Sequence, residues 1–312
     1  MAAPETLFAP LGTLAERLAG ARVLVLASSQ RHVAAVRAAL PGIGLTVFDG
    51  ARVHVPIETV EAATAVLAAS SADTLVAIGG GSAIGLGKAL RLSHAVRFIA
   101  VPTTYAGSEM TRMYGITRGT DKQTGRDDKV RPDLVLYDVA LTVTMPLALG
   151  VQSLMNAIAH VASTLSTRSI PESDAFAAVR AAIEAIEGVV GAPADLAARE
   201  AALRAASACA ALFDRGAPGA QHALAHLLGG ATGLDHAALH SVILPHFLAR
   251  LDPALLAELE SVAGPELAAR LRDLLAVAGA PTTLAELGVT REALDRALAA
   301  RPELLPLALA AY

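Results

Sequence analysis

The chain has 312 residues, of which 54% are hydrophobic, 17% are charged and 3% are aromatic, and its formal net charge is −4. An acidic chain without tryptophan offers neither the clustered cations nor the stacking rings of a nucleic-acid-binding surface, so we expect no nucleic-acid partner. Much of the hydrophobic content is alanine, and because no run of about 18 apolar residues lacks a charge, Pro or Gly, we expect no membrane-spanning segment.

The first half of the chain alternates short apolar runs with segments of helical spacing. Continuous apolar strands that alternate with helices are typical of a parallel sheet covered on both faces. We therefore predict an N-terminal α/β domain with a Rossmann-like parallel sheet. Its strands are expected at residues 22–27, 45–48, 75–78, 98–101 and 134–137, and its helices at residues 31–40 and 58–70.

The segment from Thr74 to Leu90, TLVAIGGGSAIGLGKAL, predicts a strand, a tight glycine turn and a helix. Glycines let the backbone approach a ligand closely, and the free amides at the start of a helix bind anions. The spacing matches neither G-x-G-x-x-G nor G-x-x-x-x-G-K-S/T. The turn is therefore either a phosphate site or a device that packs the helix closely on the sheet.

A second polar turn, Pro102–Thr111 with the sequence PTTYAGSEMT, follows the strand expected at residues 98–101. Because ligands bind beyond the carboxyl ends of parallel strands, we expect this turn and the glycine turn to share one crevice. The hydroxyls of Thr103, Thr104 and Ser108 can donate hydrogen bonds to a phosphate or a carboxamide. Turn formation and helix capping are the alternative role of each hydroxyl.

Beyond Pro146 the apolar spacing is helical and the strand pattern ends. We therefore place a domain boundary there, with an α/β domain over residues 1–146 and an all-α domain over residues 147–312. Breaks between the helices are expected at residues 169–172, 191–193, 215–219, 229–233 and 279–282.

Polar residues in the helical half fall in pairs with a spacing of four. This spacing places both members of a pair on one face of a helix. Because buried polar groups need partners, the pairs are most simply satisfied by converging on one polar site. The alternative for any one histidine is a core position with a backbone partner. The pairs are Asn156 and His160, His222 and His226, and His236 and His240.

The single cysteine, Cys209, excludes an intrachain disulfide. Disulfide frameworks are typical of small secreted domains. The residues after Met1 also do not form a signal-like charged and apolar segment, so we expect a cytoplasmic protein.

Taken together, these motifs resemble maleylacetate reductase, within the iron-containing alcohol dehydrogenase and dehydroquinate synthase-like superfamily. The similar segments run in the expected order from about Arg22 to His246. They are the G-G-G-S turn, P-T-T-Y-A-G-S-E-M-T, K-x-T-G-R-D at Lys122–Asp127, M-N-A-I-A-H, H-x-x-x-H-L-L-G-G and H-A-x-x-H-x-V-x-L-P-H.

The resemblance implies a dehydroquinate synthase-like fold, in which a dinucleotide-binding domain and a helical domain form a cleft that holds the site. It also implies a homodimer that reduces the alkene of maleylacetate to 3-oxoadipate with NADH or NADPH during the breakdown of aromatic compounds. A related nicotinamide-dependent reductase of another carbonyl or enoate acid, metal-assisted or not and in a biosynthetic pathway, is one alternative. A non-catalytic nucleotide-binding homologue is the other.

The resemblance also assigns a cofactor site. Ala27, Ser28 and Ser29 follow the first predicted strand and carry no charge that would repel a 2′-phosphate, so NADPH is permitted alongside NADH. The residues that would bind the cofactor are Gly79, Gly80, Gly81, Ser82, Thr103, Thr104, Ser108 and Lys122.

Metal-dependent relatives bind iron or zinc through one Asp and three His. A neutral amide in place of the carboxylate removes one charge from a divalent site, and Asn at this position resembles the maleylacetate reductase branch. We therefore expect that no metal is required. The matching positions in this chain are Asn156, His160, His222 and His236.

Reduction of an alkene conjugated to a ketone leaves an enolate, whose oxygen needs hydrogen-bond donors and which must then be protonated. Imidazoles suit both tasks because they titrate near neutral pH. Asn156 and Arg112 are expected to bind the substrate, Arg112 because of its closeness to the PTTYAGSEMT turn. The catalytic residues are expected to be His160, His222, His226, His236 and His240.

Overall fold

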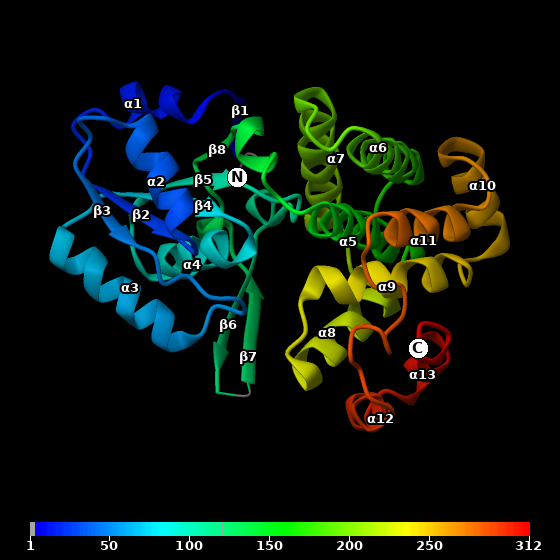
Figure 1. Cartoon of the computed structure of the whole chain (residues 1–312). Helices are drawn as coiled ribbons and strands as arrows, with labels where there is room; N and C mark the ends of the chain where they lie inside the picture. The colour runs from blue at the N-terminus through cyan, green and yellow to red at the C-terminus, as the bar shows by residue number, and fades with distance from the viewer. Residues whose placement is uncertain (1–3, 120) are drawn as a thin grey trace. The chain divides into compact units, whose positions relative to one another are not determined.

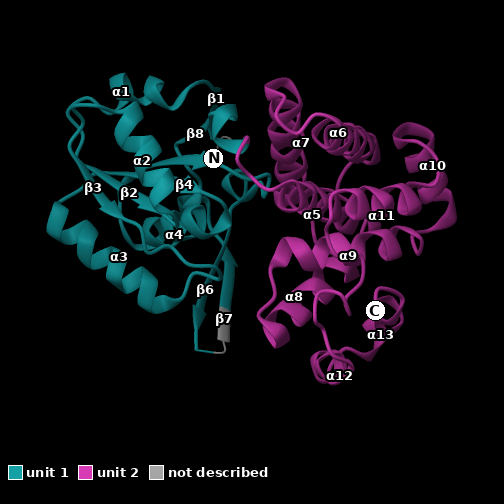
Figure 2. Ribbon diagram, in the orientation of Figure 1, with its two compact units in different colours: residues 1–142 teal, residues 143–312 magenta. Residues whose placement is uncertain are grey.

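Two units make up the chain in the computed structural model, which describes residues 4–119 and 121–312. Unit 1 spans Met1–Thr142 and unit 2 spans Val143–Tyr312 (Figure 2). Every strand found in the described residues lies in unit 1, whereas unit 2 is helical. Pro146, where we predicted the boundary, is the N-cap of the first long helix of unit 2.

Unit 1 is built on a six-stranded sheet with the strand order β1-β8-β5-β4-β2-β3, in which every pairing is parallel (Figure 1). Strands β2, β4 and β8 are buried along their whole length, as expected for a sheet covered on both faces. The prediction of a parallel α/β sheet is confirmed. The strands are β1 (Glu5–Phe8), β2 (Val23–Ala27), β3 (Leu45–Phe48), β4 (Thr74–Gly79), β5 (Arg97–Pro102) and β8 (Leu134–Tyr137).

Helices cover both faces of this sheet. Alternate strand residues such as Val25, Val76 and Ile99 form one core with Leu14 of α1 and Val36 of α2, because side chains along a strand alternate between faces. Helix α4 packs on the other face of the sheet, where Gly87 of this helix lies against Ala77 and Phe98. The helices of unit 1 are α1 (Leu14–Arg17), α2 (Gln30–Ala39), α3 (Ile57–Ser70) and α4 (Gly81–Ser93).

Three strands of unit 1 were not predicted. Strand β1 is an edge strand that pairs only with β8 in the described sheet, and none of its four residues is fully buried. Strands β6 (Met113–Arg118) and β7 (Asp121–Arg126) form a separate antiparallel hairpin. Their sequences, MYGITR and DKQTGR, lack the apolar run or the clean alternation that marks a strand.

Unit 2 is organised around α5, in which every residue from 153 to 165 is buried. A helix that is buried all round lies at the centre of a bundle, and α5 packs against α6, α7, α8 and α9. The helices are α5 (Leu147–Ser166), α6 (Glu172–Gly191), α7 (Leu196–Arg215), α8 (Ala220–Thr232), α9 (His236–Leu248), α10 (Pro253–Ala263), α11 (Leu267–Val277), α12 (Arg291–Leu298) and α13 (Leu305–Ala310).

One predicted helix break is wrong in its extent. Residues 229–233 were expected to separate two helices, but α8 continues through Gly229 and Gly230 and ends only at Gly233, which has φ +71°. A helical glycine costs about 1 kcal/mol relative to alanine, and tertiary packing can outweigh this cost. No helix in the described part of the chain is long and apolar enough to cross a bilayer.

Gly87 shows how closely α4 packs on the sheet. A Cβ atom at this position would lie 2.6 Å from ring atoms of Phe98, which is fully buried in β5. We expect Gly87→Ala to destabilise unit 1 by about 1–3 kcal/mol through this overpacking. The change is measured as a lower midpoint of thermal unfolding by circular dichroism.

Gly230→Ala is the matched control, because a Cβ atom on this helical residue would meet nothing within 4 Å. Alanine is the better helix former, so this variant should unfold at the wild-type midpoint or above it. An unchanged midpoint in Gly87→Ala would contradict the close packing of α4.

Candidate functional site

The glycine turn of unit 1 joins β4 to α4. Strand β4 ends at Gly79, whose φ of +142° is rarely adopted by residues with a side chain, and α4 begins at Gly81. A Cβ atom on Gly81 would meet nothing within 4 Å, so the start of this 13-residue helix faces open space. Its unpaired amides and positive dipole end can bind an anion such as a phosphate.

The PTTYAGSEMT turn lies directly beside the glycine turn. Strands β4 and β5 pair so that Gly79 is opposite Pro102, and the amide of Thr103 donates to the Gly79 carbonyl oxygen at 3.0 Å. The side chain of Thr104 lies against Gly80, 3.1 Å from where its Cβ atom would be. The two turns therefore lie side by side at one edge of the sheet, as a shared crevice would require.

Ser108 begins a one-turn helix, Ser108–Met110, and its buried hydroxyl has no hydrogen-bond partner among the described residues. Such a hydroxyl is available to a ligand that reaches it. The side chain of Lys122, which we assigned to the cofactor, lies outside the described part of the structure. Arg112 is only 3.9 Å from the Asp128 carboxylate, so a substrate carboxylate would compete with Asp128 for it.

The buried residue His32, on α2, also faces the glycine turn. Its Nδ1 atom and the hydroxyl of Ser28 lie 3.6 and 3.5 Å from where a Cβ atom of Gly79 would be. The Nε2 atom lies 3.3 Å from the Arg31 guanidinium, which can only donate, so Nδ1 carries the proton. Burial, followed by the charge of Arg31, lowers the pKa of His32. No sequence pattern links His32 to this turn.

A buried polar network anchors the segment that follows the second turn. The Lys88 ammonium donates to the carbonyl and hydroxyl of Thr111 at 2.9 and 3.0 Å and to the carbonyl of Met113 at 2.8 Å. The hydroxyl of Tyr137 donates to Glu109 Oε1 at 2.7 Å, and burial raises the pKa of this carboxyl. These contacts tie the turn to α4 and β8.

The histidine cluster lies in unit 2, where α5, α8 and α9 pack against one another (Figure 1). The ring of His160 on α5 lies 5.3 Å from that of His222 and 5.1 Å from that of His240, between centroids. His226 lies 4.4 Å from His222, and His236 lies 4.2 Å from His240. The predicted convergence of the three helix faces is therefore confirmed.

The imidazoles are paired by hydrogen bonds along each helix. The Nε2 atoms of His222 and His226 are 2.8 Å apart, and those of His236 and His240 are 2.9 Å apart. Each short contact requires one ring to donate and the other to accept.

Three other side chains complete the surroundings of the cluster. Phe213 of α7 stacks on His160 with a centroid distance of 4.1 Å, and Gln221 of α8 lies 2.9 Å from His240 Nδ1. We predicted neither Phe213 nor Gln221. Asn156 lies one turn before His160 on α5, and its buried Oδ1 atom has no hydrogen-bond partner among the described residues.

Burial sets the protonation of the cluster. It lowers the pKa of His160 to about 3, with a further contribution from His226. Burial also lowers the pKa of His240 well below its usual value, and the neighbouring imidazoles, His236 first among them, add to the effect. Both rings are therefore neutral near pH 7.

The cluster fits a divalent cation in geometry. One nitrogen from each of His160, His222, His236 and His240 lies within 4.8 Å of the others, and imidazole is a good ligand for zinc, copper, nickel and iron. These four residues include His240, whereas the four positions that match the metal ligands of metal-dependent relatives have Asn156 instead. All of these ligands are neutral, so none would offset the charge of the ion.

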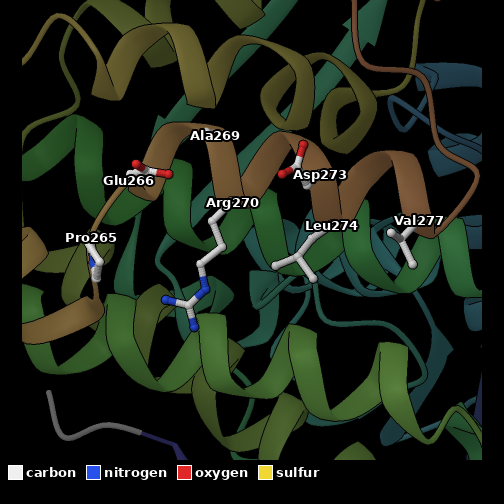
Figure 3. A pocket seen from close by; sticks show the side chains of 7 residues that line it. All are labelled: Pro265, Glu266, Ala269, Arg270, Asp273, Leu274 and Val277. Atoms are coloured by element: carbon white, nitrogen blue, oxygen red, sulfur yellow. The ribbon is translucent and has the colours of Figure 1, made fainter.

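The hollow on α11 is unrelated to either site. It has a volume of about 340 Å³ and is lined by residues of α11 and the segment before it, including Pro265 and Val277 but no member of the histidine cluster. Figure 3 shows Arg270 extending from α11 towards a neighbouring helix, where its Nε atom donates to Glu187 at 2.7 Å. Arg270, which lines this hollow, therefore serves to join α11 to its neighbour.

The two parts of the chain each match a family model. Residues 5–139 match the model of iron-containing alcohol dehydrogenase, and residues 150–302 match that of the C-terminal part of the Fe-containing alcohol dehydrogenase family. The chain belongs to the iron-containing alcohol dehydrogenase family. It is 42% identical to maleylacetate reductase 1 of Cupriavidus pinatubonensis over 290 residues, which cover 90% of this chain and 82% of that protein. Identity to the maleylacetate reductase of Burkholderia cepacia is 41%, with coverage of 90% and 83%.

Solved structures of this family share the fold. The crystal structure of maleylacetate reductase from Agrobacterium tumefaciens matches with a TM-score of 0.87 and 34% identity, covering 100% of this chain and 97% of that one. The iron-containing alcohol dehydrogenase from Corynebacterium glutamicum matches with a TM-score of 0.86 and 30% identity, covering 99% and 94%. The expected family and fold class are confirmed.

Gly81 allows the phosphate site to be tested without disturbing the protein. Because a side chain there would meet no protein atom within 4 Å, we expect Gly81→Val to keep the wild-type unfolding midpoint. The valine would occupy the space in front of the α4 amides, so we expect NADPH and NADH to bind at least about tenfold more weakly, as measured by calorimetry. Wild-type affinity in this variant would contradict a phosphate site at the glycine turn.

The neutral state of His160 predicts how stability depends on pH. Its folded pKa of about 3 lies below the ordinary value of 6.5, so its contribution is complete above pH 6.5 and is lost as the pH falls towards 3. Between about pH 7 and about pH 5 we expect metal-free protein to lose roughly 2 kcal/mol of unfolding free energy through this residue. Urea unfolding at each pH measures the loss. His160→Gln should show a shallower dependence, and an equal slope would contradict the assignment.

Proposed function

We propose that the chain is a nicotinamide-dependent oxidoreductase that reduces maleylacetate to 3-oxoadipate. The observation that carries this proposal is the cluster of five imidazoles in a chain that is 42% identical to a maleylacetate reductase. Unit 1 would bind NADH or NADPH through the glycine turn, and the imidazoles of unit 2 would act on the substrate. The uncharged residues Ser28 and Ser29 admit either nucleotide.

When bound, the nicotinamide supplies a hydride to the alkene carbon β to the ketone. The residues of this chain stabilise the enolate oxygen and provide the proton. Donors that are already in place when charge develops contribute the most, and the packed helices α5, α8 and α9 hold the imidazoles in this way. His160 and His240 are buried and neutral, so they have no extra proton to give. The proton that the enolate takes up is therefore assigned to the partly exposed rings of His226 and His236.

The proposed reaction does not require a metal. Asn156 stands where metal-dependent relatives have a carboxylate, and a neutral amide in its place removes one charge from the site and weakens the binding of a divalent ion. If an ion is held by His160, His222, His236 and His240, it would supply Lewis-acid polarisation of the ketone oxygen. Imidazole N–H groups that are not bonded to another ring or to Gln221 take that role in the proposed reaction.

The remaining parts of the proposal rest on likeness to the maleylacetate reductases. They are a small-molecule dicarboxylate substrate, a homodimer, a cytoplasmic location and a role in the breakdown of aromatic compounds. Reduction of another carbonyl or enoate acid is the second candidate. It is favoured by the Asp128 carboxylate, which lies 3.9 Å from Arg112 and would compete with a substrate carboxylate for this side chain.

The test is oxidation of NADPH and NADH in the presence of freshly prepared maleylacetate, followed by the absorbance of the reduced nicotinamide. We expect turnover by the wild-type chain, and a loss of about 10²-fold or more in kcat for His222→Ala, since this change removes a donor or its partner from the cluster. His94→Ala, at the end of α4 and outside the cluster, is the control and should keep wild-type activity.

Two outcomes would contradict the proposal. Equal losses in both variants would mean that the cluster has no special role. Absence of turnover by a wild-type protein that still binds the nucleotide would exclude maleylacetate and point to another carbonyl or enoate acid, or to a non-catalytic nucleotide-binding protein.

A further inference from the structure

We propose that Gln221 is a positioning residue that fixes the tautomer of His240 and, through it, the direction of the hydrogen bond between His240 and His236. The role in turnover rests on the proposed function, whereas the tautomer itself does not. Gln221 lies in the first turn of α8, and both it and His240 are fully buried. Water therefore cannot substitute for either side chain.

A backbone group sets the orientation of the Gln221 amide. Its Nε2 atom lies 3.3 Å from the carbonyl oxygen of His240, which can only accept. The amide must therefore direct its NH₂ group to that carbonyl and its oxygen to the imidazole. The reverse orientation would place two acceptors opposite each other at buried positions.

The amide orientation in turn sets the tautomer of His240. Gln221 Oε1 lies 2.9 Å from His240 Nδ1, and because this oxygen only accepts, Nδ1 must carry the hydrogen. A neutral imidazole has one N–H, so His240 Nε2 is left as an acceptor. Gln221 thus determines which nitrogen of His240 carries the lone pair.

The tautomer of His240 then determines the direction of the next bond. His240 Nε2 lies 2.9 Å from His236 Nε2, and because the former accepts, the latter donates. His236 therefore donates to His240, and His240 donates to Gln221. Without Gln221 either imidazole could donate to the other, and the pair would be divided between two arrangements. A metal bound at His240 Nε2 would need the same tautomer.

The tautomer can be measured by nuclear magnetic resonance of the full chain labelled with ¹⁵N-histidine, at mildly alkaline pH where histidines are neutral. Protonated and unprotonated ring nitrogens have well-separated ¹⁵N shifts, and the His240 signals are identified by their absence from His240→Asn. We expect wild-type His240 to show a protonated Nδ1 and an unprotonated Nε2. Gln221→Met, which has a similar shape but no acceptor oxygen, should lose this pattern.

Gln221→Glu is the conservative variant, because it keeps an oxygen opposite His240 Nδ1. Burial favours its protonated carboxyl, whose O–H can donate to the His240 carbonyl in place of the amide, so His240 Nδ1 should remain protonated. Ser241→Ala is the matched control: it removes a buried hydrogen bond, from the Ser241 hydroxyl to the Ala238 carbonyl at 2.8 Å, one residue away from His240. This variant should also keep the tautomer. Retention of a protonated Nδ1 in Gln221→Met, or loss of it in Gln221→Glu, would overturn the proposal.

Kinetics test the consequence for turnover. We expect Gln221→Met to lower kcat about 10- to 100-fold with little change in KM, and Gln221→Glu to restore most of the loss. Equal kcat in the wild type and Gln221→Met, with the tautomer changed, would overturn the role in turnover. If the wild type does not turn over maleylacetate, the proposed function fails while the spectra still decide the tautomer.

Discussion

The helical unit depends on the need to satisfy buried polar groups. Helix α5 is buried along residues 153–165, and the buried faces of α8 and α9 carry imidazoles among aliphatic side chains such as Leu224 and Ile243. Leaving a ring nitrogen without a partner in such surroundings costs free energy, and four of the rings bond to one another or to Gln221. Two buried atoms of the cluster, His160 Nε2 and Asn156 Oδ1, have no hydrogen-bond partner among the described residues. The same arrangement holds imidazoles in place between packed helices, with His160 and His240 neutral near pH 7, and preorganised donors of this kind stabilise a developing oxyanion in the proposed reaction. Stability and chemistry thus follow from one arrangement.

In the α/β unit the candidate site consists of backbone amides at the start of α4, which can bind an anion. Parallel strands bring the ends of β4 and β5 to the same edge of the sheet, and the hydrogen bond from Thr103 to Gly79 joins the two turns that follow them. Gly81 leaves the start of α4 open, and buried contacts of Lys88 and Glu109 hold the second turn in place. In the proposed function the two units would divide the tasks of a dehydrogenase, with nucleotide binding in one and acid-base groups in the other.

The sequence predicted the parts that follow from periodicity and failed where structure depends on distant contacts. Strands such as Leu45–Phe48 and Leu134–Tyr137 were predicted with their observed bounds because they are continuous apolar runs. Strand β1 and the β6–β7 hairpin have no such run, and their pairing partners define them. Spacing of four on three helices predicted the histidine cluster. It could not identify Phe213 or Gln221, because their roles depend on distances of a few ångströms between different helices.

In the proposed function the imidazole cluster acts on the substrate without a metal. The most direct measurement is the metal content of the purified protein, by plasma mass spectrometry, together with maleylacetate-dependent oxidation of NADPH on the same samples before chelation, after chelation and after addition of Fe²⁺ or Zn²⁺. We expect the same kcat in chelated protein that contains no stoichiometric metal, and no gain when metal is added. A kcat that rises in proportion to bound metal would contradict it, and would assign the polarising role to an ion held by His160, His222, His236 and His240.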